Sequence, residues 1–192
     1  MAPIIIKLLA AVVLGFVLTA ALGKVVIPAL RRMKAGQSIK EDGPTWHMAK
    51  QGTPTMGGVM FILAAVLVCL TVGLPGMLQG HFEHIFVLLF SLVFGAIGLL
   101  DDWKKIRREQ NMGLTTRGKF VLQLIAALLY IFTMKELGFL HNALYLPISG
   151  KVIPMPAWLF DIFAVFVVVG TVNAVNISDG VDGLAAGTSG WR

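Results

Sequence analysis

Five long apolar runs divide the sequence and limit what it can fold into. A helix needs roughly 20 apolar residues to cross a bilayer, and fewer when flanking lysine or arginine side chains reach toward the headgroups. The runs that qualify are Ile4–Leu30, Met56–Leu74, Ile85–Leu100, Phe120–Met134 and Met155–Val175. Because each run is unbroken rather than alternating, we expect helices, which satisfy their own backbone polar groups in lipid, and not the strands of a barrel.

The composition supports the same fold class. Of the 192 residues, 57% are hydrophobic and 14% are charged, whereas about a quarter of the residues of a soluble domain are charged. We therefore predict an all-α, polytopic membrane helical bundle with five transmembrane helices, forming a single integral membrane domain over residues 1–192. The sequence has no soluble basic domain that would bind nucleic acid, so we expect no nucleic acid partner.

The positions of the cations predict the orientation of the helices. Lysine and arginine gather in the loops after the first and third runs, and such loops face the cytoplasm by the positive-inside rule. The amino terminus is therefore expected outside. The cations in these two loops are Arg31, Arg32, Lys34, Lys40, Lys50, Lys104, Lys105, Arg107, Arg108, Arg117 and Lys119. They can also attract anionic lipid headgroups or a nucleotide diphosphate.

An acid pair, Asp101 and Asp102, directly follows the third run and precedes the basic stretch Lys104–Arg108. Ionised acids are expensive in hydrocarbon, so a pair at the mouth of a membrane helix suggests a functional site. The two side chains can point the same way only if the helix ends there, and we expect that it does. One carboxylate could then hold a metal ion while the other contacts a nucleophile. The alternative is a solvated helix end with acids paired to neighbouring lysines.

Two further stretches at the cytoplasmic face carry polar residues that suit a ligand. Residues Lys50–Gly58 place glycines and threonines at the start of the second run, where exposed N–H groups suit an anion. A turn and a helix cap would explain them equally well. From the end of the fifth run onward, Asn173, Asn176, Asp179 and Asp182 recur at every third position, which is more than helix capping requires.

Together these stretches predict one composite site just inside the membrane. Carboxylates, amides and lysines at one depth are the groups that phosphoryl transfer uses, because magnesium and lysine neutralise the charge of a diphosphate. A transporter would instead hold its charged residues near the bilayer midplane. A membrane scaffold would keep the helices without needing the acids.

The same residues resemble a known family. Lys50–Gly58, Asp101–Lys105 with its sequel Gly113-Leu114 and Lys119, and Asn173–Ala185 are similar to the phospho-N-acetylmuramoyl-pentapeptide-transferase branch of the polyprenyl-phosphate N-acetylhexosamine-1-phosphate transferases. The resemblance extends from about Arg31 to Thr188. It implies a magnesium-dependent transfer of phospho-N-acetylmuramoyl-pentapeptide from its uridine diphosphate carrier to undecaprenyl phosphate, which gives uridine monophosphate and the first lipid intermediate of peptidoglycan.

The resemblance also implies roles for individual residues. Asp101 would deprotonate or orient the lipid phosphate and Asp102 would help to hold Mg²⁺, so both are expected as catalytic residues and metal ligands, although the residues alone leave the division between them open. Lys119 would bind the phosphates of the nucleotide sugar. The remaining residues expected to bind the nucleotide sugar are Lys50, Thr55, Asn176, Asp179 and Asp182.

The family resemblance carries three more expectations. The protein would be a multi-pass protein of the bacterial inner membrane with its active site on the cytoplasmic face, and we allow for a homodimer. Because the family has about ten membrane helices, we expect this chain to represent the amino-terminal half, without a later Asp and a His-rich loop. Another polyprenyl-phosphate sugar-1-phosphate transferase, or a non-catalytic membrane fragment of one, is the alternative.

Overall fold

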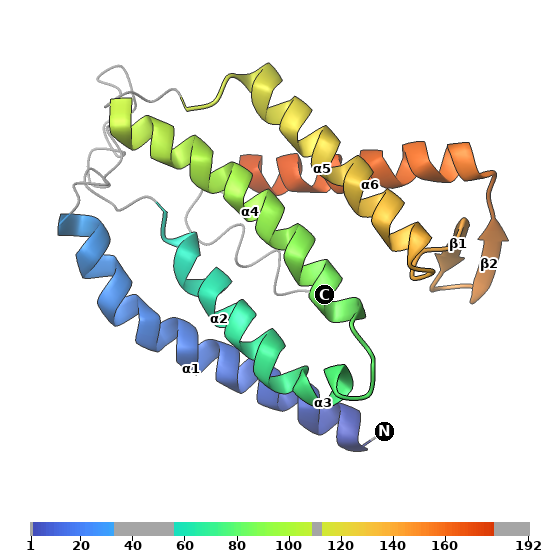
Figure 1. The fold of residues 1–192 in the computed structure, drawn as a ribbon, viewed down its shortest axis with the longest axis horizontal. Coiled ribbons are helices and arrows are strands. Elements are labelled where there is room, and N and C mark those ends of the chain that lie inside the picture. Colours follow the sequence, from blue (N-terminus) through green and yellow to red (C-terminus); the bar gives the residue numbers. More distant parts are fainter. Residues whose placement is uncertain (1, 33–55, 109–112, 179–192) are drawn as a thin grey trace. The chain divides into compact units, whose positions relative to one another are not determined.

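The computed structural model describes residues 2–32, 56–108 and 113–178, and most of them are helical (Figure 1). The elements are α1 (Ala2–Arg32), α2 (Gly58–Val72), α3 (Leu74–Met77), α4 (Glu83–Arg108), α5 (Thr116–Glu136), β1 (Ala143–Leu146), β2 (Lys151–Pro154) and α6 (Ala157–Ser178). The predicted all-α membrane bundle is confirmed. The chain divides into two compact units, residues 1–119 and 120–192.

In the first unit, α1 lies along α2, and α2 also contacts α4 (Figure 1). Two glycines of α1 face α2, and a Cβ placed on Gly23 would lie 3.5 Å from the Met60 sulfur, at ordinary van der Waals distance. About two turns nearer the amino terminus of α1, a Cβ on Gly15 would lie 3.8 Å from the Val68 side chain. Close van der Waals packing at glycine is the usual way in which membrane helices associate.

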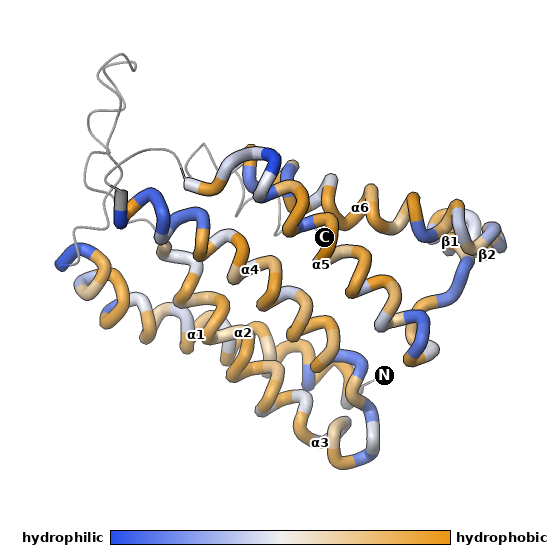
Figure 2. The backbone as a smooth tube through the Cα atoms, turned by 45° about the horizontal axis from the view of Figure 1, so that its top comes forward, coloured by the Kyte–Doolittle hydropathy of each residue, from blue (hydrophilic) through white to orange (hydrophobic). Residues whose placement is uncertain are grey.

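Among the described residues, four helices are long and apolar enough to cross a membrane, namely Ile4–Arg32, Glu83–Arg107, Thr116–Glu136 and Ala157–Ile177. Their outward side chains are largely apolar and exposed, as lipid contact requires, and Figure 2 shows the apolar colour running along α1, α2 and α4. The predicted second segment is also an apolar helix, but α2 has only 15 residues. At about 1.5 Å per residue it is shorter than the roughly 30 Å hydrocarbon core.

The end of α2 has a simple chemical cause. Gly73 follows the helix directly, and Pro75 lies two residues later in α3. Proline has no backbone N–H, so the carbonyl of Thr71 receives no helical hydrogen bond from position 75. The short helix α3 then turns the chain toward α4, with the N–H of Met77 donating to the Gly73 carbonyl at 3.1 Å.

The second unit contains α6, a short antiparallel hairpin and most of α5. Between the two helices, β1 pairs with β2 so that Tyr145 faces Val152 and Leu146 faces Lys151. Polar contacts join α5 to α6. The Asn173 amide donates to Gln123 at 2.8 Å, and Lys135 pairs with Asp161 at 2.7 Å.

Candidate functional site

The acid pair lies on α4, but this helix does not end there. It continues to Arg108, so the expectation that the helix stops at the pair is wrong. Lys105 explains the continuation, because it lies four residues after Asp101 and three after Asp102 and pairs with both. Ion pairs at these spacings stabilise a helix.

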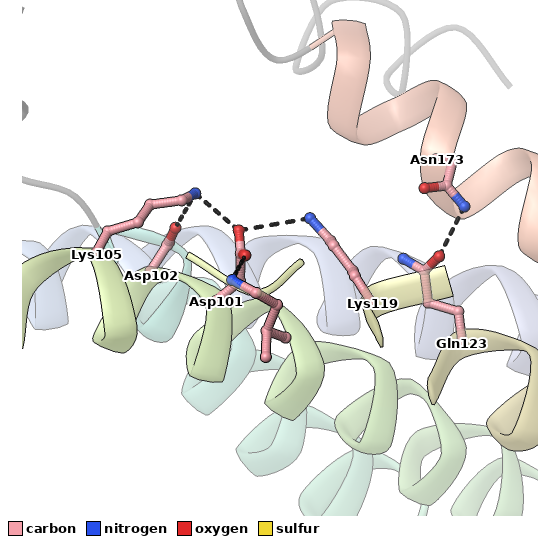
Figure 3. A network of polar contacts seen from close by, with 7 residues as sticks. Asp101, Asp102, Lys105, Lys119, Gln123 and Asn173 are labelled. Carbon is pink, nitrogen blue, oxygen red and sulfur yellow. Dashed lines mark hydrogen bonds and ion pairs between the residues drawn. The ribbon is translucent and has the colours of Figure 1, made fainter. Parts of the chain in front are cut away.

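Asp101 is the buried member of the pair, with 8% of its surface exposed. Two lysines reach the same carboxylate oxygen, Oδ2, from either side, Lys105 at 2.7 Å and Lys119 at 3.6 Å (Figure 3). The other oxygen, Oδ1, accepts a hydrogen bond from the backbone N–H of Leu114 at 2.8 Å. A buried carboxylate needs such partners, because an unpaired charge out of water is strongly destabilising.

The chain returns to α4 at Gly113, and glycine is the residue that this approach requires. A Cβ placed there would lie 2.6 Å from the Asp101 carbonyl oxygen and would also overlap the Asp101 carboxylate. Real Cβ contacts are essentially never closer than 3.0 Å. The absence of a side chain at Gly113 therefore lets the Leu114 N–H reach the carboxylate.

Thr115 fixes the start of α5 and with it the position of Lys119. Its hydroxyl oxygen accepts from the backbone N–H of Gly118 at 3.2 Å, which is the geometry of a helix N-cap. The N–H of Lys119 donates to the Thr115 carbonyl at 2.9 Å. Lys119 thus lies one turn into the helix, where its ammonium group reaches Asp101.

Asp102 differs from its neighbour in exposure. About a third of its side chain, 36%, is accessible, and its Oδ1 contacts the Lys105 ammonium at 3.2 Å. Lys105 itself is 37% exposed, so this pair contributes little to stability. Asp102 therefore offers an accessible carboxylate beside a buried one that is already bound to three donors.

The structure brings together some of the predicted site residues. Asp101, Asp102 and Lys119 form one cluster, and Asn176 is exposed in the last turn of α6, in the other unit. Lys50, Thr55, Asp179 and Asp182 lie outside the described residues. Within residues 2–32, 56–108 and 113–178, no group of three or more His, Cys, Asp or Glu side chains is placed to hold a metal ion.

The sequence alternative of acids paired to neighbouring lysines describes the contacts of Lys105, but the sequence analysis named neither Lys105 nor the Leu114 backbone as a partner. The spacing of Lys105 from the two acids was a usable signal, because residues three and four apart share a helix face. The contact of Leu114 comes from its main chain, so the type of side chain gives no hint of it. Gln123 was also missed, although a buried polar residue in an apolar membrane helix is unusual.

Gln123 and Asn173 form a separate polar contact in the second unit. Gln123 is 2% exposed, and the Asn173 amide donates both to it and to the Val169 carbonyl, each at 2.8 Å (Figure 3). Asn173 lies one turn before Asn176, the predicted nucleotide-sugar ligand. The contact therefore fixes the rotation of α6 one turn from that residue.

Comparison with known proteins now assigns the family. Residues 84–191, more than half of the chain, match the family model Glycosyl transferase family 4. The chain belongs to glycosyl transferase family 4. Residues 50–62 also match phospho-N-acetylmuramoyl-pentapeptide-transferase signature 1. The family resemblance predicted from the sequence is thereby confirmed.

Curated relatives named phospho-N-acetylmuramoyl-pentapeptide-transferase are similar to this glycosyl transferase family 4 chain along most of its length. The Geobacillus thermodenitrificans protein is 40% identical over 93% of the chain and 54% of its own length. The Desulforudis audaxviator protein is 41% identical over 95% of the chain and 57% of its own length. The Staphylococcus aureus protein is 41% identical over 92% of the chain and 54% of its own length. The chain thus spans about half the length of the curated relatives that it matches.

Proposed function

We propose that this chain provides the acid–lysine part of an active site that transfers phospho-N-acetylmuramoyl-pentapeptide from its UDP carrier to undecaprenyl phosphate. Membership of glycosyl transferase family 4 and the match of residues 50–62 to the pentapeptide-transferase signature support this function. So do the names of the relatives, which are about 40% identical to the chain.

The observation that carries the proposal is the set of donors around Asp101. Lys105 and Lys119 approach one carboxylate oxygen while the Leu114 N–H holds the other. The apolar part of α4 leads directly to this cluster, so the cluster lies at the end of a membrane-spanning stretch. A lipid phosphate in the bilayer and a soluble nucleotide sugar can meet only at such a boundary.

The proposed reaction joins an oxygen of the lipid phosphate to the phosphorus that carries the sugar. The bond from that phosphorus to the bridging oxygen of the nucleotide breaks, and uridine monophosphate leaves with the electron pair. Lys119 and Lys105 supply positive charge for the phosphate oxygens, which is the principal electrostatic need of phosphoryl transfer. Asp101, already bound to three donors, orients these lysines rather than removing a proton.

The acid pair has the chemistry of a magnesium site. Mg²⁺ commonly binds through one or two carboxylates together with substrate phosphates. Asp102 fits this donor set because 36% of its side chain is exposed, and Asp101 lies beside it. We infer that Asp102 is the principal ligand of the two, and that bound Mg²⁺ neutralises charge on the diphosphate.

The placement of the protein follows from the same proposal. We infer a bacterial inner membrane location, with the amino terminus outside and the acid cluster at the cytoplasmic face, because lysine and arginine flank this end of α4. Nucleotide sugars are cytoplasmic, so this orientation brings both substrates to the acids. Lys50, Thr55, Asn176, Asp179 and Asp182 remain the proposed ligands of the nucleotide sugar.

The test joins this chain to the remaining half of the Staphylococcus aureus relative and measures lipid-linked product from labelled UDP-N-acetylmuramoyl-pentapeptide in vesicles. We expect the hybrid to make product and the Asp101→Asn variant to lose it. The matched control is Glu83→Gln, an exposed acid at the opposite end of α4, which should leave the rate unchanged. Equal rates for Asp101→Asn and the parent would contradict the proposal. A preference for another nucleotide sugar would indicate a different sugar-1-phosphate transferase.

A further inference from the structure

The hairpin between α5 and α6 presents one side that carries no charge. Directly opposite residues of an antiparallel pair lie on the same face, so Tyr145 and Val152 share a face with Ala143 and Pro154. Tyr145 is 61% exposed and Val152 is 62% exposed. We name these four residues the apolar hairpin face. Lys151, the only charged residue of the two strands, lies on the other face with Leu144, Leu146 and Ile153, because successive residues of a strand point to opposite sides.

The turn of the hairpin, residues 147–150, combines three residues typical of turns with one large apolar residue, Ile148. The N–H of Gly150 donates to the Leu146 carbonyl at 2.8 Å, and Gly150 closes the turn with a φ of +65°. Ile148, inside this turn, is fully exposed at 102%. Turns in water favour Gly, Pro, Asn, Asp and Ser, and an isolated two-stranded hairpin is at best marginally stable there. An exposed Ile at the tip therefore indicates an apolar environment around it.

The connections to the helices keep the hairpin close to the bilayer surface. Only two residues separate Pro154, the last residue of β2, from Ala157, where α6 begins. The end of β2 therefore lies within about 10 Å of that membrane helix. Trp158, in the first turn of α6, is 66% exposed. Tryptophan and tyrosine favour the level of the lipid headgroups, where an apolar ring meets water.

We propose that the apolar hairpin face and Ile148 lie in the interfacial layer of the bilayer, and that the hairpin anchors the connection between α5 and α6 to the lipid. The occupant of this surface is thus lipid, at the boundary of headgroups and acyl chains. Lys151, on the opposite face, remains in water beside the headgroups. Lys135, near the end of α5, and Asp161, near the start of α6, neutralise each other in an ion pair.

The experiment places a nitroxide spin label on single-cysteine variants of the chain in vesicles of phosphatidylcholine and phosphatidylglycerol. Cys69→Ser removes the native thiol, Ile148→Cys and Val152→Cys report on the proposed surface, and Lys151→Cys is the matched control on the other face. Collisions with oxygen, which concentrates in lipid, are compared with collisions with a water-soluble nickel chelate. We expect the oxygen-to-nickel ratio to be several-fold higher at 148 and 152 than at 151.

Two results would overturn the proposal. Ratios that are equally low at all three labelled positions would show that the hairpin stands in water. Labels at 148 and 152 that are protected from both reagents, with spin–spin broadening that disappears on dilution with unlabelled protein, would show that a second copy of the chain covers the surface instead. Two reporters on the proposed surface guard against a local disturbance by either substitution.

Discussion

Replacing Gly113 by alanine tests how the site holds its buried carboxylate. The new methyl group would lie 2.6 Å from the Asp101 carbonyl oxygen and would overlap the Asp101 carboxylate, so the returning chain must move away. That movement breaks the 2.8 Å hydrogen bond from the Leu114 N–H. A hydrogen bond to a charged group contributes roughly 1.5–3 kcal/mol, which corresponds to a loss in kcat/KM of roughly ten- to 150-fold if the bond orients the reacting site.

The assay measures lipid-linked product with the hybrid enzyme described above and compares Gly113→Ala with Gly98→Ala. Gly98 is on the same helix as Asp101, and a Cβ there would meet nothing within 4 Å. Alanine at that position should leave the rate unchanged and favour the helix slightly, because glycine is a poor helix former. Melting curves of both variants verify folding. The reasoning would be refuted if the Gly113→Ala variant folded and its rate lay within about twofold of the rate of the Gly98→Ala variant. Such a difference is far smaller than the loss expected when the hydrogen bond breaks.

Three other predictions follow from the contacts. Thr115→Ala should lower the stability of the chain by about 1 kcal/mol through loss of the N-cap of α5, while Thr115→Ser retains it; equal melting temperatures for the two would count against the cap. Leucine at Gln123 and Asn173, singly and together, should show a coupling of about 1 kcal/mol in a double-mutant cycle, and additive effects would exclude the contact. Lys119→Ala should raise the KM for the nucleotide sugar roughly tenfold, the effect of about 1.4 kcal/mol, and an equal rise in the control Arg117→Ala would argue for a general loss of charge.

Most of the helices could be predicted because lipid leaves the backbone few alternatives. Each apolar run had to form a helix once it was inside a bilayer, and the composition required a bilayer. The lengths were harder to predict. The second run is apolar throughout, yet Gly73 and Pro75 end its helix early, whereas the third helix continues past its apolar run because Lys105 pairs with acids one turn earlier.

The hairpin was not predicted because apolarity dominated the interpretation of the sequence. Its strands have four residues each, too short for alternation to be distinguished from chance, and its turn contains the apolar Ile148. Pro147, Ser149 and Gly150 were the available signals of a turn.

Part of the candidate site could be predicted because charged residues are unusual beside an apolar run. Two acids at the end of an apolar run are conspicuous, because their charges are costly in the membrane. Their partners were less visible, since Leu114 contributes only a backbone N–H and Gly113 contributes only the absence of a side chain. Such contacts depend on the path of the chain between two helices, which local sequence patterns do not specify.

The different surroundings of the two acids follow from the continuity of α4. Successive residues of a helix point about 100° apart, so only one of two neighbouring side chains can face the chain that returns at Gly113. Asp101 faces it and is bound to two lysines and a backbone N–H, while Asp102 remains partly accessible. A helix that ended at the pair would have let both carboxylates turn toward one ligand. The continuous helix instead gives Asp101 fixed partners and leaves Asp102 partly accessible, and for this reason we propose that Asp101 orients the lysines and that Asp102 would bind the metal.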